Sequence, residues 1–265
     1  MSQIHSQLVE HSRDAHGVHQ ICLNQPDAFN VLSSEAMRDL QRIFDAIAQD
    51  PQARVAVISA KGRAFCAGHD LREMRASPSL DYYKTLFHQC SEMMMSVQRL
   101  PVPVIAAVDG IATAAGCQLV AMCDLAVASQ TSKFAVSGVN LGLFCSTPSV
   151  ALSRNLSRKA AFDMLVTGDF ITAEQALVKG LVNAVVPAEQ LADEVDRYVR
   201  SILAKPRTAV AIGKKLFYEQ LEQPLEAAYL SAENAMACNM MDEAALEGVQ
   251  AFIDKRQPAW KPQLT

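Results

Sequence analysis

The sequence predicts a mixed α/β fold that ends in an all-helical C-terminal third. Short apolar runs, such as residues 55–59 and 102–108, alternate with segments in which apolar residues recur every three or four positions. This alternation is typical of strands that lead into helices. After Pro187 only the helical spacing continues, and Pro206 and Pro224 divide that region into separate helices.

The composition indicates a globular chain with one main domain. Of its 265 residues, 50% are hydrophobic and 20% are charged, which allows one sizeable core with an appendage. The formal net charge of −4 gives no general attraction to nucleic acid or to an anionic membrane. We therefore expect neither as a partner, and an anionic ligand would need a local basic patch.

Cysteine usage and the N-terminal residues bear on the compartment. Seven cysteines without a C-x-x-C pair or a His/Cys ligand spacing predict a reducing compartment, no disulfide framework and no metal site. The first ten residues, M-S-Q-I-H-S-Q-L-V-E, show neither the apolar run of a signal peptide nor the arginine-rich pattern of a transit peptide. We therefore expect a cytoplasmic protein. Residues 101–123 carry few charges, but Pro103, Gly110 and Gly116 interrupt them, which favours a buried strand, turn and helix over a membrane span.

The first hundred residues contain the clearest strand and helix signals. Ser33 or Ser34 can cap a helix whose apolar stripe recurs every three or four residues up to Ile47. The predicted elements are, in order, a strand at 18–24, a turn-rich loop at 24–30, that helix ending before Pro51, a strand at 55–59 and a helix over 79–100.

The remaining chain begins with short elements and ends in helices. Thr172 and Gln175 have the spacing of a capping box, and Gly180 lies where a helix C-cap belongs. The predicted elements are strands at 125–129 and 133–136, a loop at 137–149, a helix at 172–179, a strand at 181–186 and helices at 191–204, 209–220 and 226–254.

Two turns that follow strands are the candidate functional segments. The first, R-A-F-C-A-G-H-D-L from Arg63, follows the strand at 55–59 and leaves backbone amides without strand partners. The second, G-I-A-T-A-A-G-C-Q-L from Gly110, leads into a helix expected to begin near Ala114, whose first N–H groups are unpaired and whose dipole is positive at that end. Two strand ends that each deliver an N–H to one point form an oxyanion hole.

Longer stretches around these turns resemble the enoyl-CoA hydratase/isomerase (crotonase) superfamily. They are A-F-C-A-G-H-D-L-R-E-M, then P-V-I-A-A-V-D-G-I-A-T-A-A-G-C-Q-L-V-A-M-C-D and then K-F-A-V-S-G-V-N-L-G, and the resemblance covers nearly the whole chain. It implies a ClpP-like spiral of repeated ββα units over residues 1–200. It also implies a C-terminal helical region, residues 201–265, that packs against neighbouring subunits in a homotrimer or a homohexamer made of two trimers.

The resemblance implies an acyl-CoA site with no cofactor other than the coenzyme A of the substrate. The oxyanion donors would be the backbone amides of His69 and Ala115. The residues implied in coenzyme A binding are Asp27, Ala28, Phe29, Ala67, Gly68, Asp70, Leu71 and Arg72, together with Phe252 and Lys255 reaching a neighbour's ligand. Arg72 and Lys255 can also be read as surface charges, Asp70 as a turn-holding residue, and the His69 side chain as either a packing residue or part of the acyl pocket.

The sequence departs from the family pattern at the residues that handle protons. Gln118 and Gly138 match the positions of the two glutamates with which the family's hydratases add water, and neither can exchange a proton. Classical hydratase activity should therefore be weak or absent. The combination G-H-D with V-N-L-G is similar to the methylmalonyl-CoA decarboxylase branch, which has a tyrosine where this chain has Cys145. The whole motif set most resembles a subgroup called enoyl-CoA hydratase domain-containing proteins.

These observations predict an acyl-CoA enzyme of the hydratase/isomerase family that stabilises a thioester enolate. Decarboxylation of a short malonyl-type CoA ester is an alternative, because loss of CO2 generates the enolate without a strong base. A third possibility is a catalytically silent acyl-CoA binder or assembly subunit that has kept the fold.

Overall fold

Two sheets form the centre of the computed structural model, which describes residues 8–76 and 78–260. The larger sheet has the strand order β1-β2-β3-β5-β7-β10, and the smaller has the order β4-β6-β8-β9. Among the described strands of the larger sheet, only the β1–β2 pair is antiparallel. The strands are β1 (Val9–Arg13), β2 (Val18–Leu23), β3 (Val55–Ala60), β4 (Ala64–Cys66), β5 (Val104–Val108), β6 (Ile111–Thr113), β7 (Leu125–Ser129), β8 (Lys133–Ala135), β9 (Ile171–Thr172) and β10 (Ala184–Val186).

The chain repeats one unit three times. A strand of the larger sheet (β3, β5 or β7) is followed by a short strand of the smaller sheet (β4, β6 or β8) and then by helical structure. This is the repeated ββα pattern that the resemblance implied. The strands β4 and β6 pair in parallel. The two candidate segments, which follow these strands, therefore emerge at the same edge of the smaller sheet.

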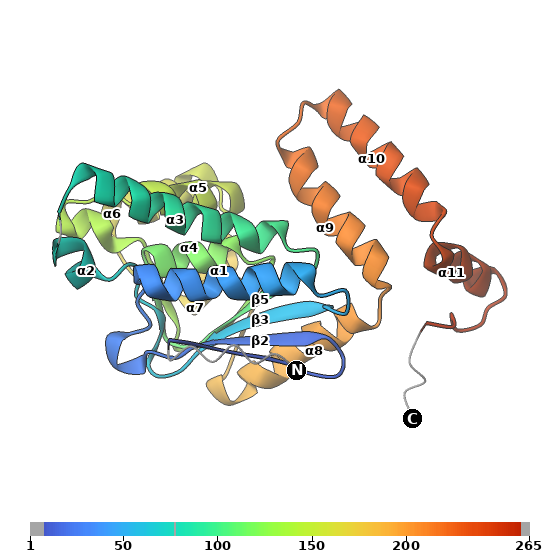
Figure 1. Ribbon diagram of the computed structural model, residues 1–265, viewed down its shortest axis with the longest axis horizontal. Coiled ribbons are helices and arrows are strands. Elements are labelled where there is room, and N and C mark those ends of the chain that lie inside the picture. The colour runs from blue at the N-terminus through green and yellow to red at the C-terminus, as the bar shows by residue number, and fades with distance from the viewer. Residues whose placement is uncertain (1–7, 77, 261–265) are drawn as a thin grey trace.

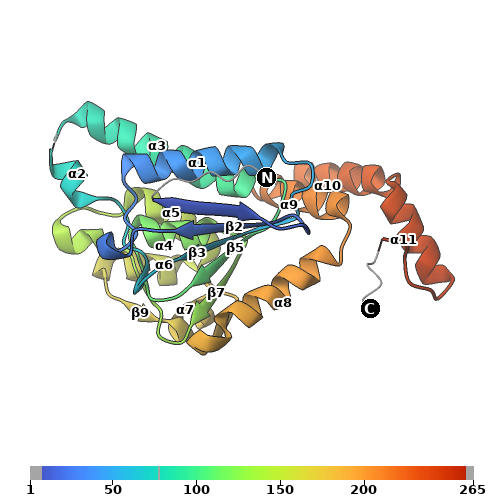
Figure 2. The same ribbon diagram turned by 60° about the horizontal axis from the view of Figure 1, so that its bottom comes forward.

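Helices cover both faces of the larger sheet (Figures 1 and 2). Parallel strands that are buried on both sides read as continuous apolar runs, and β3 is an example. Its residues Ala56 and Ile58 face the main core with the long helices, whereas Val55 and Val57 pack against residues 191–203, which form a helix on the other face of the sheet. The helices of the core are α1 (Ser34–Gln49), α2 (Leu71–Ala76), α3 (Leu80–Arg99), α4 (Ala115–Met122), α5 (Ser146–Asn155), α6 (Arg158–Thr167), α7 (Ala173–Lys179) and α8 (Leu191–Leu203), with 3₁₀ turns η1 (Pro26–Ala28), η2 (Ser137–Leu141) and η3 (Ala188–Gln190).

Predicted caps are confirmed, whereas several helix boundaries differ. Ser33 caps α1 by accepting a hydrogen bond from the Ala36 amide, and Thr172 and Gln175 form the capping box of α7. The expected loop at 137–149 contains η2 and the start of α5. One helix was predicted over 226–254, and that prediction is wrong: the first helix ends at Met240, and Asp242 caps a new one.

The last three helices form an arm that extends away from the core (Figure 1). They are α9 (Arg207–Leu221), α10 (Leu225–Met240) and α11 (Glu243–Ile253). Many large apolar side chains of the arm are exposed in the single chain, for example Leu225, Met236, Met241 and Phe252. The division of the chain at residue 200, which remains a prediction, falls inside α8.

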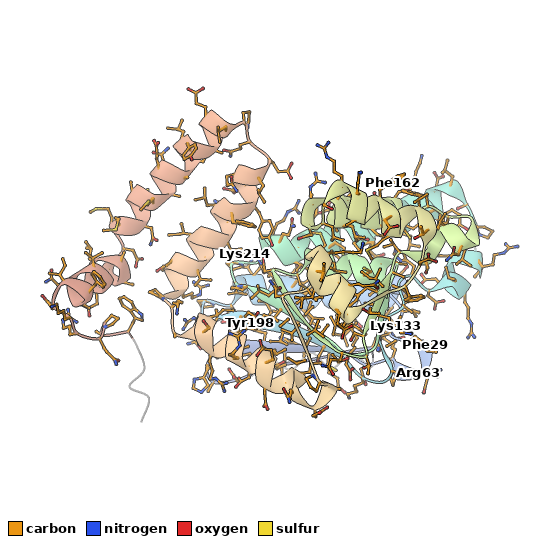
Figure 3. The ribbon with its side chains drawn as sticks, turned by 180° about the vertical axis from the view of Figure 1, so that it is seen from behind. Phe29, Arg63, Lys133, Phe162, Tyr198 and Lys214 are labelled. Atoms are coloured by element: carbon orange, nitrogen blue, oxygen red, sulfur yellow. The ribbon has the colours of Figure 1, made fainter. Side chains whose placement is uncertain are left out.

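A buried polar cluster, which we call the anchor, joins the arm to the core. It consists of Lys214 and Tyr218 of α9 and Asp124, which precedes β7. The Lys214 ammonium donates to Asp124 Oδ2 at 2.7 Å and to two backbone carbonyls, those of Val97 and Val102, at 2.9 Å each. Tyr218 Oη donates to the other oxygen of Asp124 at 2.8 Å. Figure 3 shows Lys214 at the junction between the arm and the core.

Among the described residues, no helix is both long and apolar enough to cross a membrane.

Candidate active site

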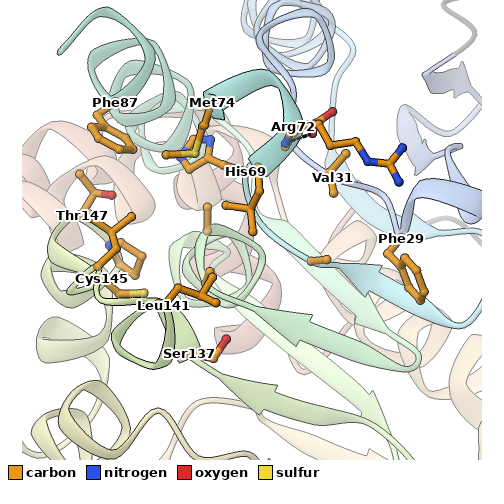
Figure 4. Close-up of a pocket in the computed structure, with 18 of the residues that line it drawn as sticks. Phe29, Val31, His69, Arg72, Met74, Phe87, Ser137, Leu141, Cys145 and Thr147 are labelled. Carbon is orange, nitrogen blue, oxygen red and sulfur yellow. Dashed lines mark hydrogen bonds between the residues drawn. The ribbon is translucent and has the colours of Figure 1, made fainter. Parts of the chain in front are cut away.

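A cavity of about 590 Å³ opens at the edge of the smaller sheet where the two candidate turns emerge. Helices α2 and α3 form one wall and the segment from η2 to the start of α5 forms the other (Figure 4). The lining residues are Asp27, Ala28, Phe29, Val31, Ala67, His69, Asp70, Leu71, Arg72, Met74, Phe87, Ala114, Ala115, Ser137, Gly138, Leu141, Leu143, Phe144, Cys145, Ser146, Thr147 and Pro148. Most of these side chains are apolar, so the interior suits an apolar or weakly polar ligand.

The two turns contact one another at the base of this cavity. Gly68 has a φ of +87°, and a Cβ built on it would lie 2.9 Å from the Ala114 Cβ and 3.1 Å from the Ala115 nitrogen. Only glycine therefore permits this approach. Ala114, the residue before α4, also has a positive φ of 52°, so the amide of Ala115 is turned out of the strand direction.

Within the described part of the chain, the amides of His69 and Ala115 are not among the backbone hydrogen-bond donors. Ala115 is the first residue of α4, where the N–H has no intrahelical acceptor. At His69, the bridge with Leu32 is made by the Leu32 amide, which donates to the Gly68 carbonyl. The amide of His69 takes no part in it. Two amides from turns that touch are thus available at one end of the cavity, which is the arrangement that an oxyanion hole requires.

The side chain of His69 lies in the wall made by α2 and α3. Its ring meets the Phe87 ring edge-on, with 5.6 Å between the centroids. Neither ring nitrogen makes a hydrogen bond of normal geometry within the described residues, although both are buried. Burial lowers the pKa of His69, while the Leu32 backbone and the Glu73 carboxylate partly oppose this effect.

The acidic residues next to His69 are already hydrogen-bonded. Asp70 Oδ1 accepts from the amides of Arg72 and Glu73 at 2.8 and 3.3 Å and so begins α2. The Glu73 carboxylate accepts from the amide of Ser34 at 2.9 Å and also from its hydroxyl group, which ties α2 to the start of α1. These carboxylates are therefore occupied by turn and helix contacts.

The two positions matched to catalytic glutamates are placed differently. Gly138 lines the cavity, but Gln118 does not; it lies further along α4 than Ala115, is only 4% exposed, and its Oε1 has no hydrogen-bond partner among the described residues. A Cβ at Gly138 would lie 2.5 Å from the Leu143 carbonyl oxygen and 2.8 Å from Cys145 Sγ. Cys145 itself lines the cavity, and burial raises the pKa of its thiol.

The residues expected to bind coenzyme A fall into two groups. Asp27, Ala28, Phe29, Ala67, Asp70, Leu71 and Arg72 all line the cavity, and Gly68 supports the turn beneath them. Phe29 is covered on one face by the guanidinium of Arg63, 4.5 Å from the ring centroid. Phe252 and Lys255 lie at the end of the arm and do not line the cavity of their own chain; Phe252 is 86% exposed.

The sequence interpretation did not assign Met74 and Phe87 to the site. In Figure 4 both lie next to His69, opposite Cys145 and Thr147. Phe87 belongs to the apolar stripe of α3, and its spacing fits a core residue equally well. No local signal could have distinguished the two roles, because the cavity forms only when α2 and α3 meet the η2 segment.

Comparison with known proteins agrees with this geometry. Residues 13–263 match the family model described as Enoyl-CoA hydratase/isomerase. The rat protein named "Enoyl-CoA hydratase domain-containing protein 3, mitochondrial" is 47% identical over 249 residues, which cover 94% of this chain and 83% of the rat protein. The chain therefore belongs to the enoyl-CoA hydratase/isomerase family.

Solved structures of the family share the whole fold. The crystal structure of an enoyl-CoA hydratase from Mycobacterium smegmatis is 58% identical and has a TM-score of 0.95, covering 96% of this chain and 99% of that one. The structure of human enoyl Coenzyme A hydratase domain-containing protein 3 is 45% identical and has a TM-score of 0.92, covering 96% of this chain and 100% of the human chain. The expected crotonase fold is thereby confirmed.

The expectation of a cytoplasmic location is contradicted by the same comparison. The rat, mouse and human relatives are all named as mitochondrial proteins. The expectation rested on the first ten residues, and the residues with which this sequence begins do not decide a compartment.

Proposed function

We propose that this protein binds acyl-CoA thioesters and stabilises the enolate of the thioester with the amides of His69 and Ala115. The main support is the contact between the two turns, which presents two available amides to one end of an apolar cavity. Loss of one such donor from an oxyanion hole typically costs about 2.7 to 4 kcal/mol in the transition state. Coenzyme A would lie along the rim formed by residues 27–29 and 67–72.

The enolate proposal predicts a difference between ligands. A coenzyme A thioether that carries a nitronate places negative charge where the enolate oxygen forms, and it should bind at least about 10²-fold more tightly than acetyl-CoA, as expected for a transition-state analogue. Isothermal titration calorimetry measures both affinities, and S-ethyl-CoA, which has no oxygen at that position, is the matched control. Equal affinities for the three ligands would contradict an oxyanion hole, and no binding of any would contradict an acyl-CoA site.

Classical hydration should be slow. Adding water across a double bond needs one group to activate the water and another to protonate the α-carbon, and positions 118 and 138 hold glutamine and glycine. We expect crotonyl-CoA to bind but to be hydrated well below an ordinary turnover of about 10 per second. An ultraviolet assay of the enoyl thioester checks this, and ordinary turnover would show that other groups activate the water.

Restoring the carboxylates is sterically limited at one position. Gln118→Glu can be made without adding atoms, but at Gly138 a side chain would be too close to both the Leu143 carbonyl and Cys145 Sγ, so Gly138→Glu requires the loop to move. The double variant should hydrate crotonyl-CoA faster than either single variant only if this loop adjusts, because cooperating groups are strongly non-additive. Circular dichroism and thermal melting must accompany the assay.

Decarboxylation of a short malonyl-type CoA ester is the second candidate reaction. No glutamate lines the cavity among the described residues, and decarboxylation needs the oxyanion hole without a strong base. Release of CO2 from methylmalonyl-CoA is the direct test. Tight binding of the nitronate with no turnover of any thioester would instead indicate a silent acyl-CoA binder.

We also propose that the protein assembles as a homotrimer or a homohexamer through the arm. Large apolar side chains are exposed along α9 to α11, and apolar side chains that gather on one exposed surface mark an interaction site. In such an assembly Phe252 and Lys255 could reach a neighbour's coenzyme A. Light scattering that shows a monomer at micromolar concentration would contradict this proposal.

A further inference from the structure

We propose that the imidazole of His69 is the proton-transfer group of this site: it exchanges a proton with the α-carbon of the bound thioester. This inference rests on the proposed enolate function, and it adds a side-chain role to a residue whose backbone amide has already been placed in the oxyanion hole. The reaction class is proton abstraction next to a thioester carbonyl.

The first support is the state of the other titratable groups around the cavity. Asp70 is engaged by two backbone amides, and the thiol of Cys145 has a raised pKa and is neutral at pH 7. Asp27 and Arg72 are exposed at the rim. Among the described lining residues, His69 is thus the one side chain away from the rim that can accept a proton at neutral pH, and its ring has no hydrogen bond of normal geometry, although the Leu32 backbone acts on it.

The second support is the surroundings of the ring. The Phe87 ring lies against it from α3, and Met74 of α2 lies beside it in Figure 4. Leu32, in the segment before α1, contributes a backbone group, and Glu73 of α2 is the charged group that faces the ring, with its carboxylate held by Ser34. Both imidazole nitrogens are buried and lack a normal hydrogen bond, although buried polar atoms are nearly always paired. As the ring lies, neighbouring atoms cover both nitrogens, so the imidazole must rotate to present one of them to the cavity, where the substrate would supply the missing partner.

The step balances without any further reactant. A neutral imidazole nitrogen takes the proton from C2, the C–H electron pair forms the C1–C2 double bond, and the thioester carbonyl electrons move to oxygen. The amides of His69 and Ala115 hold the resulting enolate oxygen. The imidazolium then exchanges its N–H hydrogen with solvent and protonates C2 again, so that in heavy water C2 gains a deuteron. Burial favours the neutral imidazole, which is the form that acts as the base.

Exchange of the α-hydrogens of butyryl-CoA in D2O tests this role, because a saturated chain cannot be hydrated. We expect the wild-type protein to incorporate deuterium at C2, as followed by mass spectrometry. His69→Gln keeps the backbone amide and should lower the exchange rate by about 10²- to 10⁴-fold, the usual contribution of a positioned acid or base. Its affinity for butyryl-CoA and for the nitronate thioether should stay within about threefold of wild type, below the 1.4 kcal/mol that a tenfold change represents.

His88→Gln is the matched control, because His88 is an exposed histidine on the same helix as Phe87 and does not line the cavity. It should exchange at the wild-type rate. The pH profile of the wild-type protein gives a second readout that needs no variant: the rate should rise through an apparent pKa below 6.5 and then stay level. This follows because burial lowers the pKa of His69 and the deprotonated ring is the active form.

Two outcomes would overturn the inference while leaving the proposed function intact. One is a well-folded His69→Gln protein that exchanges as fast as wild type. The other is a wild-type protein that binds butyryl-CoA and the nitronate tightly but gives no exchange above the protein-free rate at any pH. If neither ligand binds, the proposed function itself fails. If His69→Gln does not fold, a wild-type rate that first rises only near pH 9 or above would assign the proton transfer to a thiol and reject His69.

Discussion

The anchor and the cavity wall both contain buried polar groups, but these groups are hydrogen-bonded in the anchor and largely unpaired in the cavity wall. In the anchor, the Lys214 ammonium has three acceptors and the Asp124 carboxylate has donors on both oxygens. In the cavity wall, both ring nitrogens of His69 lack a hydrogen bond of normal geometry among the described residues, and so does the Oε1 of Gln118 on α4, which lies outside the lining. A fully satisfied buried network fixes structure, whereas unsatisfied groups cost stability and are retained where a ligand uses them. The contrast agrees with a structural role for the first region and with the function proposed for the second.

The substitution with the largest expected effect on the unfolding free energy removes a charge from the anchor. Lys214→Met removes one partner of a buried ion pair and leaves the Asp124 carboxylate without its main counter-charge. Removal of one member of such a pair typically costs about 3–5 kcal/mol of unfolding free energy. Urea denaturation followed by circular dichroism measures the loss.

Lys215→Met is the control for this experiment. Lys215 is exposed on the same helix, and its ion pair within the described residues is with Glu219, at 3.8 Å. Its replacement should change the unfolding free energy by less than about 0.5 kcal/mol, as is usual for surface substitutions. If Lys214→Met cost no more than Lys215→Met, the anchor would not hold the arm.

The anchor also shows which parts of the structure the sequence could not predict. The strands, the helical tail and the two turns follow from local patterns, since apolar runs, glycines and caps each act on their own neighbours in the chain. Lys214 has no such signal, because one lysine on an amphipathic helix looks like a solvated charge until Asp124 is brought to it by the fold. The same holds for Phe87, whose spacing on α3 fits a core residue and a cavity wall equally well.

A third buried polar cluster lies between these extremes, at the edge of the larger sheet. His11 Nε2 and His19 Nδ1 are 3.0 Å apart, and His19 Nε2 lies 3.2 Å from an Asp50 oxygen that also binds Arg13. His11 Nδ1 has no partner within the described residues. Burial, and then the neighbouring His19, lower the pKa of His11 from 6.5 to about 4.

This partly satisfied cluster should make stability depend on pH. Because the folded state holds His11 neutral, the unfolded chain binds more protons between pH 6.5 and 4, and stability is lost as the pH falls through that window. At 1.36 kcal/mol per pKa unit, the loss between pH 7 and pH 5 is about 2 kcal/mol. Urea denaturation at the two pH values measures it, and His11→Phe should flatten the dependence. An equally steep loss in that variant would assign the pH effect to other groups.

The smallest change in stability is expected at Gln118, a buried amide whose oxygen has no hydrogen-bond partner among the described residues. It tests most directly whether an unpaired buried group serves structure or function. Gln118→Met keeps the length and approximate volume of the side chain and removes that oxygen. An unsatisfied buried polar group costs about 1–3 kcal/mol, so its replacement should leave the unfolding free energy unchanged or raise it by up to about 1 kcal/mol.

If Gln118 serves the bound thioester, the same variant should lose deuterium exchange or turnover while its stability does not fall. Urea denaturation and the butyryl-CoA exchange assay on one protein preparation give both numbers. A stability loss of more than about 1 kcal/mol, of the kind typical for broken buried networks, would place Gln118 with the anchor as a structural residue instead.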